Sequence, residues 1–148
     1  MAGIERTAIT EWEGGLADGS GTVSGVSSGA IEGLPVTWAS RVEAPEGRTS
    51  PEELVAAAHA SCYAMAFSHV LGGAGHAPER LHVTATVTAE LGEGGLAIIR
   101  SDLEVRGRVS GLDAAEFQGQ ADEAEQGCPV SNALRGSIEI GVSATLED

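Results

Sequence analysis

The longest apolar stretch of the chain is residues 51–71, where hydrophobic side chains recur on nearly every side of a predicted helix. Ser50 suits the N-cap and Pro51 the first helical position, and Glu53 stands where its carboxylate can reach back to the cap. Gly72–Gly73 predicts the end of this helix. Because a helix that is apolar all round is typical of a protein interior, we expect this one to be buried at the centre of the fold.

Alternation of apolar and polar residues predicts strands in the rest of the chain. The predicted strands are residues 4–13, 20–26, 34–43, 81–91, 97–109 and 138–146. Glycine and serine interrupt residues 14–30, and a GEGG segment separates two of the later strands. These breaks predict two hairpins, so we expect the strands to pair in meander order.

Two further helices are predicted in the second half of the chain. Asp113 and Glu116 have the spacing of a capping box, which opens a polar helix that runs to about Gln126. A short helix follows, with Pro129 at its first position and Gly136 behind it. Strands and helices in this order predict an α+β fold with antiparallel sheets, each with one face in water.

The length of the chain indicates a single domain that spans residues 1–148. The predicted central helix is a difficulty for a monomer, because one polar helix and half-exposed strands cannot cover it on all sides. We therefore expect a homodimer in which two chains wrap each other's central helices.

The charge of the chain argues against some partners. The formal net charge is -14 at pH 7 and no lysine occurs, so we expect neither nucleic acid nor an anionic membrane as a partner. The start of the sequence predicts no secretory signal, and we expect no apolar run to reach membrane-spanning length. These features predict a cytoplasmic protein. In that setting two cysteines are more often catalytic, redox-active or metal-binding than a permanent disulfide.

Cys62 lies eleven residues after Pro51, too deep in its helix to gain from the helix N-terminus. Apolar burial alone would raise the pKa of its thiol and make it inert, so a reactive Cys62 needs a nearby cation. Without lysine, that cation must be an arginine or a histidine. Arg41, near the end of a predicted strand, is one candidate, and Glu52 could hold its guanidinium by a bidentate ion pair.

Cys128 has a different setting, because it occupies the predicted N-cap of the short helix that begins at Pro129. Free backbone amides at that position stabilise a thiolate. The residues alone leave simpler interpretations open. A buried cysteine is usually an inert core residue, and His59 is more readily a core histidine bonded to the backbone than a catalytic base. A metal site is not favoured, since the histidines have no recognised ligand spacing.

These motifs carry a resemblance. The segment TSPEELVAAAHASCYAMAFSHVL, followed much later by GCPVSNAL, resembles the OsmC/Ohr family of thiol-dependent peroxidases, and AAHA favours the OsmC-type branch. The resemblance implies that Cys62 attacks the peroxide and that Cys128 resolves the resulting sulfenic acid. It also implies that Arg41 is the family's arginine and that Glu52 is the glutamate that orients it.

The resemblance further implies a homodimer of intertwined α+β subunits with two active sites at the interface. The implied reaction reduces organic hydroperoxides, and hydrogen peroxide less efficiently, to alcohols through a Cys62–Cys128 disulfide. An external dithiol, which in this family includes lipoylated proteins, then restores both thiols. The implied role is defence against oxidative and osmotic stress, and no metal, haem or flavin cofactor is needed. The apolar surroundings of Cys62 also favour an organic hydroperoxide.

Two rival functions stay open from the sequence. One is a cysteine hydrolase in which His59 acts as base for Cys62, since the two residues are one helical turn apart. The other is a non-catalytic module whose central helix lines a pocket for an apolar ligand. The first leaves Cys128 without a role, and the second leaves both cysteines without one.

Overall fold

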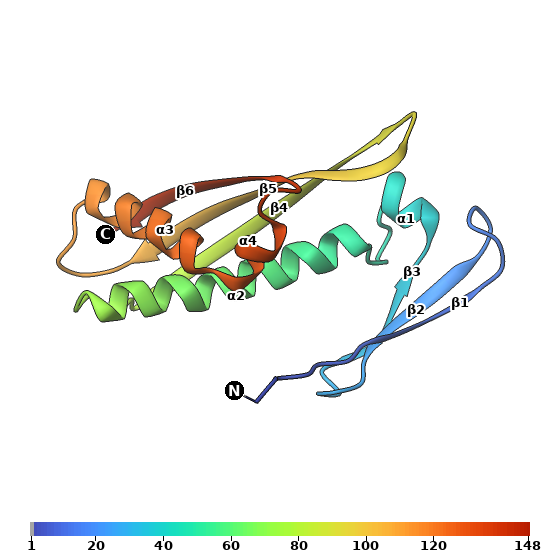
Figure 1. The fold of residues 1–148 in the computed structure, drawn as a ribbon, viewed down its shortest axis with the longest axis horizontal. Coiled ribbons are helices and arrows are strands. Elements are labelled where there is room, and N and C mark those ends of the chain that lie inside the picture. Colours follow the sequence, from blue (N-terminus) through green and yellow to red (C-terminus); the bar gives the residue numbers. More distant parts are fainter. Residues whose placement is uncertain (1) are drawn as a thin grey trace. The chain divides into compact units, whose positions relative to one another are not determined.

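The computed structural model describes residues 2–148 and has two small sheets and one long central helix (Figure 1). The described part of the chain divides into two compact units, with the boundary between Leu54 and Val55. The predicted α+β class is confirmed. That residues 1–148 form a single domain stays a prediction.

The first unit contains a three-stranded antiparallel sheet in the order β1-β2-β3. Its strands are β1 (Ile9–Glu13), β2 (Ser20–Gly25) and β3 (Ile31–Val36). The predicted hairpin between the first two strands is confirmed, and Trp12 on β1 pairs with Gly21 on β2. A Cβ atom at Gly21 would lie 2.7 Å from the Trp12 ring, so the absence of a side chain at Gly21 leaves room for this ring.

The prediction of a strand over residues 34–43 is wrong for its second half. Helix α1 (Trp38–Val42) begins directly after β3. The Thr37 hydroxyl accepts a hydrogen bond from the Ser40 backbone amide, and the Ser40 hydroxyl accepts one from the Thr37 amide. This capping box turns an alternating pattern into a helix, because its bonds satisfy amides that a strand would give to a neighbour.

Helix α2 (Pro51–Gly73) begins where the sequence predicts. The Ser50 hydroxyl accepts a hydrogen bond from the Glu53 amide, but the Glu53 carboxylate accepts one from the Thr49 hydroxyl instead of reaching back to the cap. Only half of the predicted capping box is therefore present. At the other end, Gly75 adopts a φ of 85°, and the backbone closes two hydrogen bonds around it, as in a Schellman motif.

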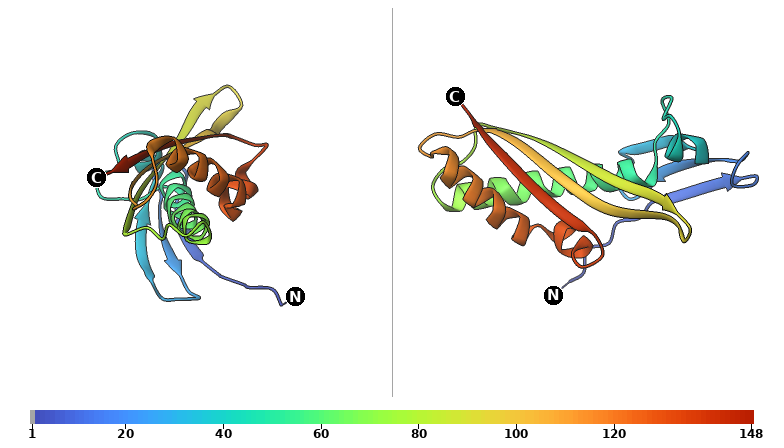
Figure 2. Two further views of the ribbon diagram at one scale, coloured as in Figure 1. Left: turned by 90° about the vertical axis from the view of Figure 1, so that its left-hand side faces the viewer. Right: turned by 90° about the horizontal axis from the view of Figure 1, so that it is seen from above.

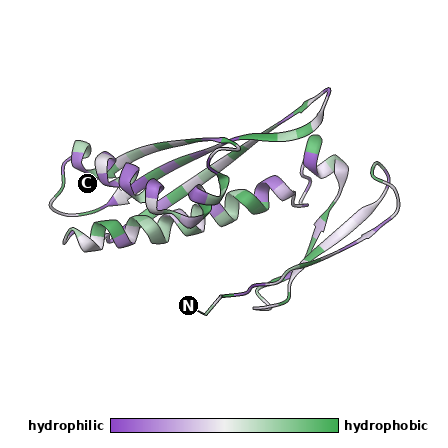
Figure 3. Cartoon of the chain, viewed as in Figure 1, coloured by the Kyte–Doolittle hydropathy of each residue, from purple (hydrophilic) through white to green (hydrophobic). Residues whose placement is uncertain are grey.

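Burial of α2 differs from the prediction of a helix buried on all sides. The buried residues within a single chain are His59, Tyr63, Phe67 and Leu71, one every four residues along one face. Met65, on another face, is 68% exposed. Hydrophobic residues nevertheless occur along much of the helix (Figure 3). The helix therefore leaves apolar surface that a single chain does not cover.

The expectation about membrane-spanning length is also wrong, because α2 is long and apolar enough to cross a membrane by length and composition. Its most apolar window is 22% buried in the chain. The core helix of a soluble protein can have the same length and composition, so this property alone does not place α2 in a membrane.

The second unit contains a three-stranded sheet in the order β4-β5-β6. Its strands are β4 (Arg80–Gly92), β5 (Gly95–Arg108) and β6 (Glu139–Glu147). The β4–β5 pair is antiparallel as predicted, but β6 runs parallel to β5, so the prediction of antiparallel sheets is wrong for this pair. The reason is topological: two helices separate β5 from β6 and return the chain to the end of the sheet where β5 began.

These two helices are α3 (Ala114–Gly127) and α4 (Pro129–Leu134). The predicted capping box at the start of α3 is confirmed. Helices α2, α3 and α4 lie on one side of the sheet (Figures 1 and 2). Phe117 of α3 packs on Phe67 of α2 with ring centroids 5.0 Å apart, and the Tyr63 hydroxyl donates a hydrogen bond to the Ala121 carbonyl. These contacts fix α3 against α2.

Candidate functional site

Arg41 and Glu52 form the predicted bidentate ion pair in the first unit. Arg41 Nε lies 3.0 and 3.1 Å from the two carboxylate oxygens of Glu52, and Nη2 lies 2.8 Å from the nearer one. The side chains are 30% and 12% exposed, respectively. The arginine lies on α1 and not on a strand, and Glu52 lies in the first turn of α2. The pair therefore holds the guanidinium at a fixed place beside the start of α2.

The electrostatics and packing of this pair agree with its geometry. Burial by itself raises the pKa of Glu52. Hydrogen bonding and the charge of Arg41 together lower it by more than burial raises it, so the net pKa is below its usual value. The Arg41 guanidinium also lies 5.9 Å from the centroid of the Trp38 ring, within the range of a cation–π contact. Within residues 2–54, Arg41 directs Nε and Nη2 to Glu52, and its Nη1 forms no hydrogen bond.

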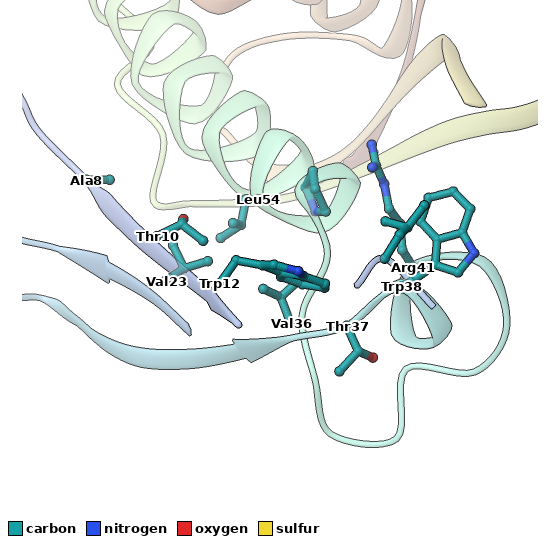
Figure 4. Close-up of a pocket in the computed structure, with 11 residues that line it drawn as sticks. Ala8, Thr10, Trp12, Val23, Val36, Thr37, Trp38, Arg41 and Leu54 are labelled. Carbon is teal, nitrogen blue, oxygen red and sulfur yellow. The ribbon is translucent and has the colours of Figure 1, made fainter. Parts of the chain in front are cut away.

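A cavity of about 440 Å³ lies in the first unit. Apolar and aromatic side chains line most of it, among them Trp12, Val36 and Leu54 (Figure 4). Among the described lining residues, Arg41 is the one charged side chain, and it lies with Trp38 at one end of the cavity. This cavity could not be predicted from the sequence, because its walls come from β1, β2, β3, α1 and the start of α2.

The two cysteines, 66 positions apart in the sequence, are neighbours in the second unit. Cys62 on α2 is half-buried, and Cys128 is fully buried at the predicted N-cap of α4. Both are free thiols, and Cys62 packs against the buried core cluster that contains Cys128. The structure therefore brings together the two thiols that the sequence analysis singled out.

The surroundings of Cys62 do not favour its thiolate. Burial raises the pKa of the Cys62 thiol, a hydrogen bond with the Val130 backbone lowers it, and the neighbouring Cys128 raises it again. The net direction is upward. This agrees with the expectation that Cys62 needs a cation, because the groups that act on it within residues 55–148 leave it protonated at neutral pH.

His59 is fully buried beside this pair, one turn before Cys62 on α2. Its Nδ1 lies 2.7 Å from the Ser101 hydroxyl on β5, and its Nε2 lies 2.8 Å from the Ser131 hydroxyl on α4. Burial lowers the pKa of the ring, and the charge of Glu125 opposes that shift only in part. The prediction of a core histidine is confirmed, but its partners are two serine hydroxyls and not the backbone.

These contacts weaken the hydrolase interpretation, because both ring nitrogens of His59 are engaged by serines. Neither serine was identified from the sequence. The sequence contains a weak signal for Ser101, since it is a polar residue at a position where the alternation of the strand places apolar side chains. Ser131 gave none, since its partner is 72 positions away. Among residues 2–148, no cluster of three or more metal-ligating side chains is positioned to hold a metal ion.

Of the four predicted site residues, the structure pairs Arg41 with Glu52 in the first unit and Cys62 with Cys128 in the second. Helix α2 carries one member of each pair, Glu52 and Cys62.

Known proteins are similar to this chain in both sequence and fold. Peroxiredoxin OsmC of Escherichia coli is 39% identical over 137 residues, which cover 93% of this chain and 94% of that protein. An organic hydroperoxide resistance protein of Xanthomonas axonopodis pv. citri is 37% identical over 98 residues, which cover 62% of this chain and 63% of that protein.

Among solved structures, an organic hydroperoxide resistance protein from Elizabethkingia anophelis aligns with a TM-score of 0.76 and 26% identity, over 99% of this chain and 100% of that one. The family model described as "OsmC-like protein" matches residues 44–143, which include all of α2 and Cys128. The resemblance stated from the two cysteine motifs is therefore confirmed, and the chain belongs to the family of OsmC-like proteins.

Proposed function

We propose that this protein is a thiol-dependent peroxidase that reduces organic hydroperoxides to alcohols and contributes to peroxide resistance. The observation that carries the proposal is the pair of neighbouring free thiols, Cys62 and Cys128, in the second unit. Two relatives of this chain are named peroxiredoxin OsmC and organic hydroperoxide resistance protein. A peroxide-reducing enzyme is the function that accounts for both thiols.

In the first step, the Cys62 thiolate attacks the terminal oxygen of the hydroperoxide. A sulfur–oxygen bond forms, the oxygen–oxygen bond breaks, and the electron pair leaves with the alkoxide. The alkoxide takes up a proton and departs as an alcohol. Sulfur is oxidised to a sulfenic acid and the peroxide is reduced.

Arg41 is the group to which we assign activation of Cys62. The thiol's raised pKa means that a cation must stabilise the thiolate, and the same cation would stabilise charge on the leaving oxygen. Nη1 of Arg41 forms no hydrogen bond within residues 2–54, and the bidentate contact with Glu52 holds the guanidinium; both observations support this assignment. Glu52 acts through Arg41 and is a positioning residue.

In the second step, the Cys128 sulfur attacks the Cys62 sulfenic acid, a disulfide forms, and water leaves. The contact between the two side chains supports this role for Cys128. An external dithiol then reduces the disulfide by thiol–disulfide exchange, and a lipoylated protein is the reductant that we propose.

The substrate preference rests on the cavity that Arg41 borders. Its walls are mainly apolar, and Arg41 is the charged side chain among the described lining residues. An apolar wall beside a cation favours a hydroperoxide that carries an organic group over hydrogen peroxide.

The exposed apolar surface of α2 supports a homodimer, since a second copy could cover residues such as Met65 that a single chain leaves 68% exposed. We propose that the protein works as this dimer in the cytoplasm, without nucleic acid or membrane as partner. The net charge of -14 supports the absence of an anionic partner. Light scattering that reports a stable monomer at micromolar concentration would contradict the dimer.

The experiment that tests the function is consumption of an organic hydroperoxide in the presence of a dithiol reductant. Cys62→Ser removes the attacking thiol, so turnover should fall to the background rate. Cys128→Ser should consume a first equivalent of peroxide to form the Cys62 sulfenic acid and then a second that overoxidises it to the sulfinic acid, because Cys128 is not there to resolve it. Turnover by Cys62→Ser at the parent rate would refute the proposal.

A further inference from the structure

Two pairs of side chains face each other between α2 and α4. On α2, His59 and Cys62 are three residues apart and share a helix face. At the start of α4, Cys128 and Ser131 are also three residues apart. His59 Nε2 lies 2.8 Å from the Ser131 hydroxyl, and Cys62 packs against the buried cluster that contains Cys128. The thiol contact and the histidine–serine contact are therefore neighbouring links between the same two helices.

Helix α4 depends on such links for its position. It has six residues, too few to be stable on its own, and Cys128 makes no side-chain capping bond at its start. At its other end, Nη2 of Arg135 lies 2.6 Å from a carboxylate oxygen of Glu125 on α3. Near Cys128, the contact from Ser131 to His59 is a fully buried polar link between α4 and α2.

We infer that His59 and Ser131 are a positioning pair, which holds the helix that carries Cys128 so that its thiol stays against Cys62. The inference rests on the proposed function for its catalytic consequence, which is fast closure of the disulfide after Cys62 is oxidised. Neither residue touches the peroxide in this scheme, so both act through Cys128.

The chemistry of the His59 ring suits this role. Both ring nitrogens are used, because Ser101 on β5 holds Nδ1 while Ser131 on α4 takes Nε2. Burial lowers the pKa of the ring and keeps it neutral, so one nitrogen donates and the other accepts. A serine hydroxyl can match either role, so the two hydroxyls satisfy the ring completely. The ring thereby connects the sheet, α2 and α4.

The step that depends on this link is the condensation of the Cys62 sulfenic acid with the Cys128 thiol. One sulfur–sulfur bond forms, the sulfur–oxygen bond breaks, and the oxygen leaves as water with the thiol proton. If α4 is less well held, the Cys128 thiol is near Cys62 for a smaller fraction of the time. The sulfenic acid then lives longer, and a second hydroperoxide oxidises it to the sulfinic acid.

The chain offers a matched pair of variants to test this. Ser131→Ala and Ser101→Ala each remove one hydroxyl from a fully buried site, and each leaves one His59 nitrogen without a partner. Only Ser131→Ala removes the link to α4. Chemical denaturation of both variants measures the loss of stability that they have in common.

The first measurement is the equilibrium between dithiol and disulfide in glutathione buffers, followed by mass spectrometry. We expect Ser131→Ala to disfavour the Cys62–Cys128 disulfide about tenfold, since one buried hydrogen bond is lost from the helix that carries Cys128. This corresponds to about 30 mV for a two-electron couple. Ser101→Ala should shift the equilibrium by less than about twofold, because Ser131 still holds α4. This measurement needs no peroxidase activity, so it tests the positioning role of His59 and Ser131 even if the proposed function is wrong.

The second measurement follows reaction with an organic hydroperoxide in single turnover. Ser131→Ala should oxidise Cys62 at the parent rate but close the disulfide more slowly, with a larger sulfinic acid fraction as peroxide concentration rises. Ser101→Ala should behave like the parent in both respects. Equal disulfide shifts in the two variants, or none in Ser131→Ala, would overturn the inference and leave the histidine a structural core residue.

Discussion

The surroundings of Cys62 and those of Arg41 differ in a way that bears on the chemistry. Cys62 lies next to fully buried groups, Cys128 and His59, and the influences on it within its own unit raise the pKa of its thiol. Arg41 borders an apolar cavity, and its side chain is 30% exposed. Among the described residues of its own unit, no cation is among the groups that shift the pKa of Cys62, whereas residues 2–54, which include Arg41, contain no cysteine.

The proposed mechanism therefore needs residues from both regions. Burial protects the resting thiol from indiscriminate oxidation, because the protonated form is a poor nucleophile. In the proposed mechanism, activation depends on the cation of the Arg41–Glu52 ion pair. Removing the cation should have the largest effect, loosening it a smaller one, and perturbing the buried cluster the smallest.

Arg41→Ala should slow the oxidation of Cys62 by about a hundredfold or more at neutral pH. The pKa of the thiol, already raised by burial, would lose the proposed compensating charge. Raising the pH should recover only part of the rate, because more thiolate forms while the leaving oxygen still lacks its cation. Single-turnover oxidation across a pH series measures both effects.

The matched control for that variant is Arg48→Ala, which removes the same charge from an exposed arginine of the same unit. It should retain the parent rate and the parent thiol pKa. If Arg41→Ala behaves like this control, another group activates Cys62.

Glu52→Gln should slow the same step by about fivefold, a smaller effect than loss of the arginine. The amide keeps one acceptor for Arg41, but a charge-assisted bidentate contact becomes a weaker neutral one, at a cost of about 1 kcal/mol in positioning. Arg41 retains its charge, so the pH profile should shift little. A rate loss as large as that of Arg41→Ala would show that Glu52 has more than a positioning role.

Acid should destabilise the buried cluster through His59. The folded-state pKa of His59 is lowered by burial, so the unfolded chain binds its proton first as the pH falls. The contribution of the neutral ring is complete above the unfolded pKa, about 6.5, and is lost as the pH falls from there through the folded pKa. The free energy of unfolding from denaturant titrations at several pH values measures this loss.

A His59→Gln variant should flatten that pH dependence, because glutamine does not titrate. If the free energy of unfolding falls with the same slope in the parent and the variant below pH about 6.5, carboxylates and not His59 cause the acid sensitivity.

Local signals explain the parts of the fold that the sequence predicted well. The start of α2 and the capping box of α3 are set by residues within four positions of each other, so their spacing alone identifies them. The strand β4 alternates cleanly because one of its faces packs on helices. The Arg41–Glu52 pair was predictable from the need for a cation without lysine and from the family resemblance.

The parts that the sequence did not predict depend on distant or competing interactions. Alternation over residues 34–43 competes with the Thr37–Ser40 capping box, and the local hydrogen bonds win. The parallel pairing of β6 with β5 depends on the path of two helices between them. The contacts of His59 with Ser101 and Ser131 join residues 42 and 72 positions apart, and no short motif encodes such a pairing.

The most direct test of the central claim is intact-protein mass spectrometry after one equivalent of an organic hydroperoxide. The account predicts that the parent loses the mass of two hydrogens and that peptide mapping finds a Cys62–Cys128 disulfide. Cys128→Ser should instead gain oxygen on Cys62, and Cys62→Ser should keep its mass. Oxygen or a disulfide found elsewhere, with Cys62 still a free thiol in the parent, would contradict the account.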